Sequence, residues 1–230
     1  MLGSLANGVT HISGFLEGDD SLATLKAFRA MGVDIEGPDA GRVTVRGVGM
    51  HGLQQPATAL DLGNSGTSMR LLSGLLAGQG LELTLAGDAS LSSRPMRRVT
   101  EPLAMMGAEI TTTERGTAPL HLKAVNGLRA IHYDMPMASA QVKSCILLAG
   151  LYADGQSCVI EPAPTRDHTE RMLRGFGYAV STTGNRICLE GGGQLTATTI
   201  DVPADISSAA FFLVGACIAA GSELTLEHVG

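Results

Sequence analysis

The chain has 230 residues, of which 22 are acidic and 16 basic, so its formal net charge is −6 at pH 7. Hydrophobic residues make up 44% and charged residues 17%, a composition that is typical of a globular protein with a buried core and excludes a disordered or fibrous chain. An acidic chain with 3% aromatic residues also argues against nucleic acid as a partner, because nucleic-acid sites need basic grooves and stacking rings.

The apolar segments predict neither a membrane protein nor a secreted one. The longest of them, residues 209–220, is shorter than the roughly 20 residues that a membrane-spanning helix needs. No basic segment precedes an apolar core at the N-terminus, so we expect no secretory signal and a cytoplasmic location.

Two patterns alternate along the chain, and both end at a glycine, the residue expected just past a helix C-terminus. In one, a helical segment ends and a strand follows at Gly32, Gly107 and Gly177. In the other, an alanine-rich helix ends and a strand follows at Gly8, Gly80, Gly155 and Gly221. Together they predict a tandem unit of about 70 residues that reads helix, strand, helix, strand, strand.

The predicted elements show the periodicities of strands and helices. Residues 42–46 alternate apolar and polar side chains, which predicts a strand with one packed face. The segment 96–106 places apolar residues on one helical face, and a helix opening at Asp167 has Glu170 three residues on, which is the capping-box pattern. We therefore expect helices to cover the inner side of each sheet.

The repeat also predicts that this chain is a piece of something longer. Residues 1–8 read as only the end of a helix, and the chain stops just after a fourth alanine-rich helix and its strand.

The four cysteines do not form a metal-binding pattern. None lies in a C-x-x-C pair, each sits in an apolar run, and the six histidines show no ligand spacing with them. We expect four buried, reduced thiols and no zinc or other metal site: Cys145, Cys158, Cys188 and Cys217.

The first candidate site is residues 62–70, where a run of small polar residues opens an apolar helix. Such a helix start leaves backbone N–H groups bare and favours an anion. Asn64, Ser65 and Thr67 add polar side chains, and Arg70 adds a positive charge one turn later. An ordinary N-cap with a solvated arginine explains the same pattern equally well.

The second candidate site is residues 92–98, which carry three arginines on an otherwise acidic chain. Pro95 suits the first turn of the next helix and makes Arg94 extended, so its guanidinium could reach a phosphate or carboxylate. A solvated basic patch is the alternative, and it fits Arg97 and Arg98 better than Arg94.

Two further segments, 135–144 and 162–169, also lead into helices. In the first, Ser139 is placed to cap, Ala140 lets a ligand approach the backbone, and Gln141 offers a donor and an acceptor. In the second, Arg166 could face its own helix carboxylates or a ligand, whereas His168 reads as a surface residue. Since a repeat fold can bring equivalent helix starts to one surface, we expect a site for several anionic groups. The sequence shows no nucleophile motif and no identifiable general acid or base.

Taken in order, these motifs resemble the 5-enolpyruvylshikimate-3-phosphate synthase family over essentially the whole chain. They are 62–67 with Arg70, Arg94-Pro95, 136–144 and 165–170. The resemblance implies an α/β (α+β) fold of tandem βαβαββ repeats, an inverse β-prism with the helices packed inside the sheets. It also implies a transferase that joins phosphoenolpyruvate to shikimate 3-phosphate in a cleft between two such domains, without a metal or organic cofactor.

By the same resemblance, one group of residues binds phosphoenolpyruvate: Asn64, Gly66, Thr67, Arg94 and Gln141. In relatives that tolerate the inhibitor glyphosate, the position of Gly66 is often alanine. Glycine at this position therefore predicts no tolerance, and glyphosate is a possible inhibitor of the parent enzyme.

A second group resembles the shikimate 3-phosphate site: Ser139, Ala140, Gln141 and Arg166. Gln141 is expected to touch both ligands, and Arg166 lies in a segment that reaches the shikimate phosphate.

The resemblance also implies which parts of the family's enzyme lie outside these residues. The opening Lys-Ser motif and the second domain, with its proton-transfer residue, do not match this chain. We expect residues 1–203 to form a domain of three units and residues 204–230 to begin the return into the missing domain. We expect this chain alone to be inactive and to bind shikimate 3-phosphate weakly at most. Its last helix, with Phe211, Phe212 and Leu213, should self-associate or pack over the first unit.

Two other functions stay open. A related enolpyruvyl transferase acts on UDP-N-acetylglucosamine and carries a reactive cysteine ahead of an Ala-Arg-Pro turn, but the equivalent stretch, residues 87–95, contains no cysteine. A stand-alone, non-catalytic anion-binding domain is the alternative that is not an enzyme.

Overall fold

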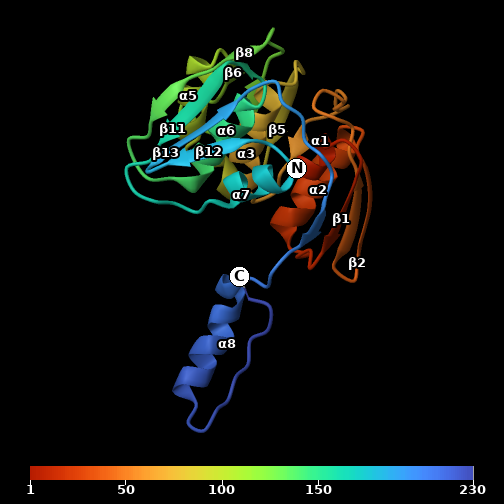
Figure 1. The fold of residues 1–230 in the computed structure, drawn as a ribbon, viewed down its shortest axis with the longest axis vertical. Helices are drawn as coiled ribbons and strands as arrows, with labels where there is room; N and C mark the ends of the chain where they lie inside the picture. Colours follow the sequence, from red (N-terminus) through yellow and green to blue (C-terminus); the bar gives the residue numbers. More distant parts are fainter. Residues whose placement is uncertain (230) are drawn as a thin grey trace.

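The computed structural model describes residues 1–229, which form three four-stranded sheets around a group of helices (Figure 1). The first sheet contains, in spatial order, β14 (Thr199–Asp201), β1 (Val9–Ser13), β3 (Arg42–Arg46) and β2 (Asp34–Asp39). The second contains β4 (Leu60–Asp61), β5 (Leu83–Ala86), β7 (Leu120–Leu122) and β6 (Ile110–Thr111). The third contains β9 (His132–Asp134), β11 (Gln156–Ile160), β13 (Arg186–Glu190) and β12 (Val180–Thr183). A pair of short strands, β8 (Leu128–Arg129) and β10 (Ala153–Asp154), completes the set.

The three large sheets share one topology. Each has a single parallel pair at one edge, β14–β1, β4–β5 or β9–β11, and antiparallel pairing elsewhere. This confirms the predicted repeat and the βαβαββ fold class. The periodicity did not reveal the parallel edge strand, which has only two or three residues in each sheet. The first sheet takes this strand from near the end of the chain, with Thr199 opposite His11.

The helices fill the space that the sheets enclose, as Figure 1 shows for α3 and α6. All residues from Val142 to Gly150 of α6 are buried, because this largely apolar helix is packed on every side. It lies very close to α3, since a Cβ added at Gly74 would be 2.1 Å from the carbonyl oxygen of Cys145. The helices are α1 (Leu2–Leu5), α2 (Asp19–Ala30), α3 (Gly66–Ala77), α4 (Ala89–Ser92), α5 (Arg97–Met105), α6 (Ala140–Gly150), α7 (His168–Gly175) and α8 (Ile206–Ile218).

The glycines that define the repeat have positive φ angles, as predicted for residues just past a helix C-terminus: Gly8, Gly32, Gly80, Gly107, Gly155, Gly177 and Gly221. The predicted apolar face of segment 96–106, which comprises α5 and its two cap residues, is confirmed, because the four side chains assigned to it are fully buried: Met96, Val99, Leu103 and Met106. Pro95 lies two residues before the first residue of α5, not in its first turn, since α5 begins at Arg97.

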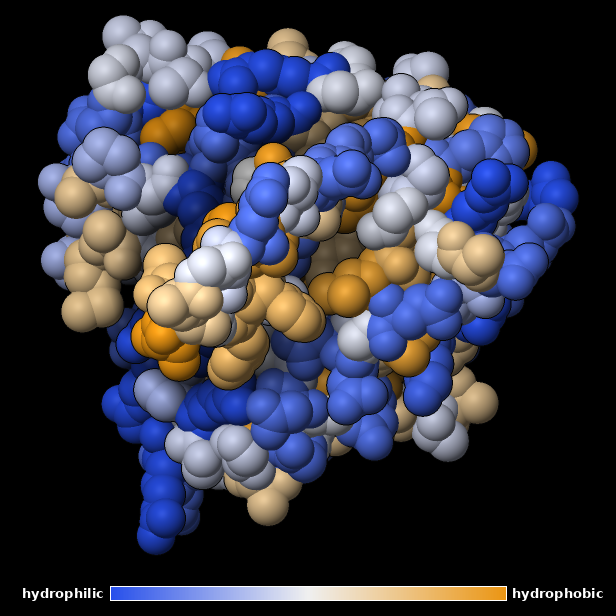
Figure 2. Space-filling view, turned by 90° about the horizontal axis from the view of Figure 1, so that it is seen from below, coloured by the Kyte–Doolittle hydropathy of each residue, from blue (hydrophilic) through white to orange (hydrophobic). Residues whose placement is uncertain are grey.

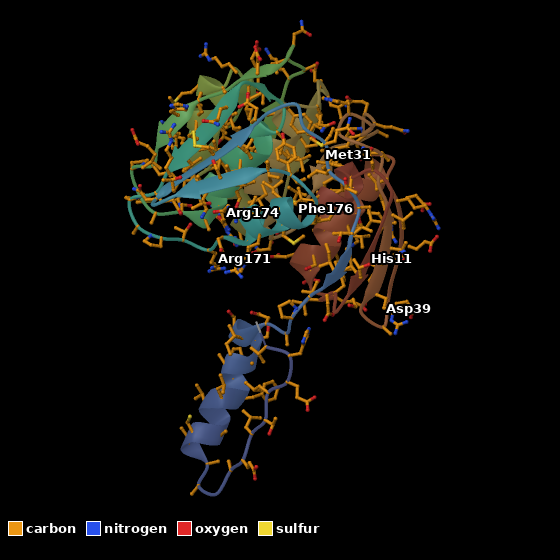
Figure 3. The ribbon with its side chains drawn as sticks, viewed as in Figure 1. His11, Met31, Asp39, Arg171, Arg174 and Phe176 are labelled. Carbon is orange, nitrogen blue, oxygen red and sulfur yellow. A yellow bond between two sulfur atoms is a disulfide. The ribbon has the colours of Figure 1, made fainter. Side chains whose placement is uncertain are left out.

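The predicted capping box at α7 is wrong. The Asp167 carboxylate makes no cap and accepts a hydrogen bond from Arg171 Nε at 2.8 Å, at the rim of the body where Figure 3 labels Arg171. The Glu170 side chain turns inward to Lys143 Nζ at 2.7 Å. A buried ammonium attracts a carboxylate more strongly than a backbone N–H does, and this charge-assisted contact explains the difference.

The expectation of four buried, reduced thiols holds only for Cys145. Cys158 and Cys188 stand directly opposite each other on β11 and β13 and form a disulfide. The register of the two strands brings these cysteines together, and this pairing could not be predicted from their spacing in the sequence. Cys217 is exposed because α8 has no buried residue and does not pack against the body formed by the other described residues.

The helix α8 extends away from the body, so the prediction that it packs over the first unit is wrong (Figure 1). After β14 the chain turns outward, and a return segment meets it where Ala204 N donates to His228 O at 2.7 Å. Phe211 is 83% exposed and Phe212 68% exposed. Figure 2, which views the molecule from the side to which α8 extends, shows apolar side chains uncovered there. In the part of the chain that the structure describes, no helix combines the length and apolar character that crossing a membrane requires.

Candidate functional site

The start of α3 forms the floor of the candidate site. Ser65 caps the helix, with Ser68 N donating to its Oγ at 3.2 Å, as the sequence predicted for an N-cap. The preceding turn is held by Gly63 N, which donates to Asp61 Oδ1 at 2.9 Å. Gly66 follows the cap, and because it has no side chain, none stands between the backbone of the first turn and a ligand.

Arg94 reaches this helix start from the turn after α4. Its Nη2 donates a hydrogen bond to Asn64 Oδ1, and Asn64 Nδ2 in turn donates to Asp88 Oδ2 at 2.8 Å. The N–H of Leu91 and the Asn64 amide hold the pKa of the Asp88 carboxyl below its usual range. Asp88 therefore stays ionised and turns the amide oxygen of Asn64 toward Arg94.

Gln141 connects the starts of α6 and α3. Its Nε2 donates to Thr67 Oγ1 at 2.8 Å, and its Oε1 accepts from Arg70 Nη1 at 2.6 Å. Ser139 caps α6, with Val142 N 3.4 Å from its Oγ. The positive ends of two helix dipoles therefore lie side by side.

Three guanidinium groups form what we call the arginine cluster: Arg70 and Arg94, which flank Gly66, and Arg98, whose charge acts on Arg70. A Cβ added at Gly66 would be 3.0 Å from Arg94 Nη1 and 3.2 Å from Arg70 Nη1. Burial first, and then the charges of Arg98 and Arg94, lower the pKa of Arg70. Within residues 1–229, no carboxylate lies within 4.0 Å of any of these three groups. The cluster therefore concentrates positive charge that an anion would neutralise.

A hollow of about 510 Å³ adjoins this cluster, and we call it the Arg166 hollow. One wall is residues 138–141 at the start of α6, and the other is Pro164, Thr165 and Arg166. Arg166 is exposed, and no carboxylate of the described residues pairs with it, because Asp167 is taken by Arg171. Gln141 lines the hollow and also contacts the arginine cluster, so one side chain is common to both sites.

The structure thus brings all the candidate residues to one place. Five of them meet through direct contacts: Asn64, Gly66, Thr67, Arg94 and Gln141. The other three line the Arg166 hollow: Ser139, Ala140 and Arg166.

Two neighbouring residues lie outside the site, as the sequence indicated. Arg97 donates to the carbonyl of Glu114 at 3.3 Å, and His168 is exposed at the start of α7. Among residues 1–229, no group of three or more His, Cys, Asp or Glu side chains is placed to hold a metal ion.

The model of one protein family matches the chain over residues 1–230, and its description is EPSP synthase (3-phosphoshikimate 1-carboxyvinyltransferase). The chain belongs to the EPSP synthase family. A 3-phosphoshikimate 1-carboxyvinyltransferase of Methylococcus capsulatus is 69% identical over the whole chain, and one of Alkalilimnicola ehrlichii is also 69% identical. The solved EPSP synthase of Acinetobacter baumannii superposes with a TM-score of 0.94 at 63% identity.

The chain spans about half the length of these EPSP synthases. It covers 53% of the Methylococcus protein, 52% of the Alkalilimnicola protein and 52% of the Acinetobacter chain, while each comparison covers all of the present chain.

Sequence reasoning missed three acidic or basic residues that support the site in this EPSP synthase family member: Asp88, Lys143 and Glu161. The segment Asp88-Ala-Ser-Leu91 has the pattern of a helix N-cap, and this pattern could have identified Asp88 from the sequence. Lys143 is the only charged residue in the apolar run of α6, and a lone charge in such a run points to a buried partner. Only the packing of α6 against α7 and the end of β11 identifies that partner.

Proposed function

We propose that the chain is the part of a 3-phosphoshikimate 1-carboxyvinyltransferase that holds both acidic substrates. The enzyme would transfer the enolpyruvyl group of phosphoenolpyruvate to the 5-hydroxyl of shikimate 3-phosphate, a step in aromatic amino acid biosynthesis. The observation that carries this proposal is the arginine cluster, which has no carboxylate partner among residues 1–229 and lies next to a hollow that shares Gln141 with it.

In this proposal, phosphoenolpyruvate occupies the arginine cluster. Asn64 and Thr67 lie beside Gly66, whose lack of a side chain leaves room between Arg94 and Arg70. A guanidinium is a planar fork of donors that matches a phosphate or carboxylate. Because two of the three cations in the cluster flank a helix start, they can accept both charged groups of this small substrate.

Shikimate 3-phosphate would occupy the Arg166 hollow. Its volume of about 510 Å³ accommodates a phosphorylated six-membered ring, with Arg166 near the phosphate and the capped start of α6 facing the ring. Gln141 would contact both substrates from between them.

The reaction is an addition followed by an elimination. The 5-hydroxyl loses its proton and attacks C2 of phosphoenolpyruvate while C3 takes a proton. The tetrahedral intermediate then loses phosphate from C2 and a proton from C3, which restores the enol double bond. The residues of this chain would hold two anions side by side and offset their repulsion with positive charge. We assign no proton-transfer residue here, and we propose that the part of the enzyme beyond these residues supplies it. For this chain alone we expect no turnover.

A direct test is to titrate the chain with shikimate 3-phosphate by NMR, alone and with a separately made polypeptide for the part of a relative that this chain does not match. We expect weak binding alone, tighter binding and turnover with the second polypeptide. No binding under either condition would overturn the proposal. Binding without turnover in the mixture would favour a non-catalytic anion-binding domain instead.

Neighbouring arginines provide a matched pair of variants. Arg94→Met removes a cation that lies against Asn64 and Gly66, whereas Arg97→Met removes one that points to the carbonyl of Glu114. We expect only the first to weaken phosphoenolpyruvate binding. Equal effects would show that general positive charge, and not this site, attracts the ligand.

Three finer points belong to the same proposal. Glyphosate would compete at the arginine cluster, and its competition with phosphoenolpyruvate can be measured in the same titration. UDP-N-acetylglucosamine should not bind, which separates this chain from the related enolpyruvyl transferase. A cytoplasmic location stays a prediction that cell fractionation can test.

A further inference from the structure

A buried cluster of three ionised side chains lies beneath the Arg166 hollow. Lys143 of α6 has a side chain that is 1% exposed, and its Nζ lies 3.2 Å from Glu161 Oε2 and 2.7 Å from Glu170 Oε1. Glu161 directly follows β11, and Glu170 lies in the first turn of α7. The cluster therefore joins three elements that meet behind the site.

Glu161 has a second contact that leads to the surface. Its Oε1 accepts a hydrogen bond from the hydroxyl of Thr165, which lines the Arg166 hollow and precedes Arg166. The backbone of Glu161 is fixed as well, since its N–H donates to Asn185 O at 2.9 Å and its carbonyl accepts from Asn185 Nδ2 at 2.8 Å. The Glu161 carboxylate is thus held in a fixed position, and the Thr165 hydroxyl is hydrogen-bonded to it.

Glu170 differs from Glu161 in having no hydrogen bond, among the described residues, to the wall of the Arg166 hollow. It contacts the same Lys143 nitrogen, but its other oxygen, Oε2, is buried with no hydrogen-bond partner in the described part of the chain. No hydrogen bond of the described residues joins its side chain to Thr165 or Arg166. The two glutamates therefore share the buried lysine, and only Glu161 reaches the wall of the hollow.

Stability alone does not account for this arrangement. Moving three charged groups out of water is costly, and a buried ion pair often stabilises a fold no more than apolar side chains of the same size. What the buried Lys143–Glu161–Glu170 cluster provides is a fixed orientation of the Thr165 hydroxyl. The turn that carries Arg166 is held in place through the same contact. A side chain held in place before a ligand arrives loses less entropy on binding.

We propose that Glu161 is a positioning residue for Arg166. Through Thr165 it fixes the 164–166 turn opposite the start of α6, so that the Arg166 guanidinium is preorganised for the phosphate of the ligand in the hollow. The choice of shikimate 3-phosphate as that ligand rests on the proposed function, whereas the order of the turn does not depend on it.

The first experiment measures the turn in the ligand-free chain. Backbone amide and Arg166 side-chain order are compared by NMR relaxation in the unaltered chain, in Glu161→Gln and in the matched control Glu170→Gln. Both variants remove one negative charge from Lys143. We expect Glu161→Gln alone to loosen residues 164–166. An unchanged turn in Glu161→Gln, or equal loosening in both variants, would overturn the proposal.

The second experiment measures binding of shikimate 3-phosphate to the full chain. We expect Glu161→Gln to weaken binding about tenfold and Glu170→Gln by less than about twofold, with phosphoenolpyruvate binding unchanged in both. In an Arg166→Met background, Glu161→Gln should cause no further loss, because the residue on which it acts is gone. A loss that persists in that background would mean that Glu161 acts only through the stability of the fold.

Should Glu161→Gln fail to fold, the Thr165–Glu161 hydrogen bond can be removed by substituting Thr165 instead. Thr165→Val removes the hydroxyl and leaves the buried charges intact, while Thr165→Ser keeps the hydroxyl. We expect the serine variant to preserve the order of Arg166 and the valine variant to lose it. Equal order in both would overturn the proposal. If the unaltered chain shows an ordered turn but binds no shikimate 3-phosphate, the proposed function fails and the positioning role of Glu161 does not.

Discussion

The amide nitrogen of Gln141 donates a hydrogen bond to the hydroxyl of Thr67 at 2.8 Å, across 74 positions of sequence. This contact joins the first turns of α6 and α3, the equivalent helices of two repeats. Because each helix start directs free N–H groups and a positive dipole end to the same point, the repeat itself builds a site for anions. Arg70, which donates to the other end of the Gln141 amide, then adds a full charge.

Gly66→Ala should weaken phosphoenolpyruvate binding and leave the fold intact. The new methyl group would lie 3.0 Å from Arg94 Nη1 and 3.2 Å from Arg70 Nη1, so both guanidinium groups must move. We expect a loss of about tenfold or more in affinity, measured by titration. The control is Gly175→Ala at the exposed end of α7, where the added Cβ meets no atom within 4 Å beyond its chain neighbours and the backbone of its own helix. Equal binding by Gly66→Ala and the unaltered chain would contradict the placement of this ligand.

Asp88→Asn should weaken the same binding, because an amide in place of the carboxylate no longer fixes the orientation of Asn64. The substitution also changes acid stability. The pKa of Asp88 is lowered from its ordinary 3.8, so its carboxylate stabilises the fold above pH 3.8 and this contribution is lost as the pH falls through the lowered pKa.

Urea unfolding from pH 6 down to pH 2 checks this prediction. The difference in unfolding free energy between the unaltered chain and Asp88→Asn should be constant above pH 3.8 and shrink below it. Asp205→Asn, at the cap of α8, is the control for binding, because its pKa is also lowered but by Ser208 and not by the site. A binding loss in Asp205→Asn equal to that in Asp88→Asn would argue against an orienting role for Asp88.

Lys143→Met should be among the most destabilising single substitutions in this chain. It leaves Glu161 and Glu170 buried without their shared cation, and breaking a buried pair in this way typically costs about 3–5 kcal/mol. Chemical denaturation measures the loss. Lys26→Met on the exposed side of α2 is the control and should change stability by less than about 0.5 kcal/mol. A loss of similar size in both variants would show that the buried position carries no special cost.

Thr10→Val should stabilise the protein. Thr10 is fully buried, and its hydroxyl has no hydrogen-bond partner among the described residues. Replacing that hydroxyl by a methyl group of similar size removes a desolvation penalty of about 1–3 kcal/mol. The midpoint of urea unfolding should rise with an unchanged slope. Thr183→Val, at an exposed position in β12, provides the comparison and should have little effect. A lower midpoint for Thr10→Val would reveal a hydrogen bond to a buried water.

The exposed helix α8 should make the chain self-associate. Phe211 and Ile218 are each at least 80% exposed, and apolar surface of this extent is buried whenever a partner is available. Sedimentation velocity over a range of concentrations should show oligomers that disappear in Phe211→Ser/Phe212→Ser or when residues 205–230 are deleted. A parent chain that is monomeric at all concentrations and unchanged by the deletion would refute this.

Much of the fold followed from local patterns. The glycines marked the helix ends, the alternation in residues 42–46 marked β3, and the apolar face of α5 was placed correctly. The parallel edge strands β4 and β9 were missed, because two or three residues are too few to show a period.

For the candidate site, too, some features could be predicted from local sequence and others could not. Its residues could be named from helix starts and from the family resemblance, since both are read over short stretches of chain. Such patterns could not show that Arg94 contacts Asn64 or that Glu170 turns inward to Lys143. Nor could they show that Gln141 both contacts the arginine cluster and lines the Arg166 hollow.

By itself, the sequence determined where helices begin and end, that a unit recurs, and which polar groups stand at the helix starts. These properties depend on neighbours within a few residues, through backbone φ angles, caps and side-chain periodicity. Only the tertiary structure decided that Cys158 pairs with Cys188, that α8 stands clear of the body, and that one buried lysine holds two carboxylates. Strand register and the packing of helices against one another set those contacts. Both depend on many interactions between residues that are distant in the chain.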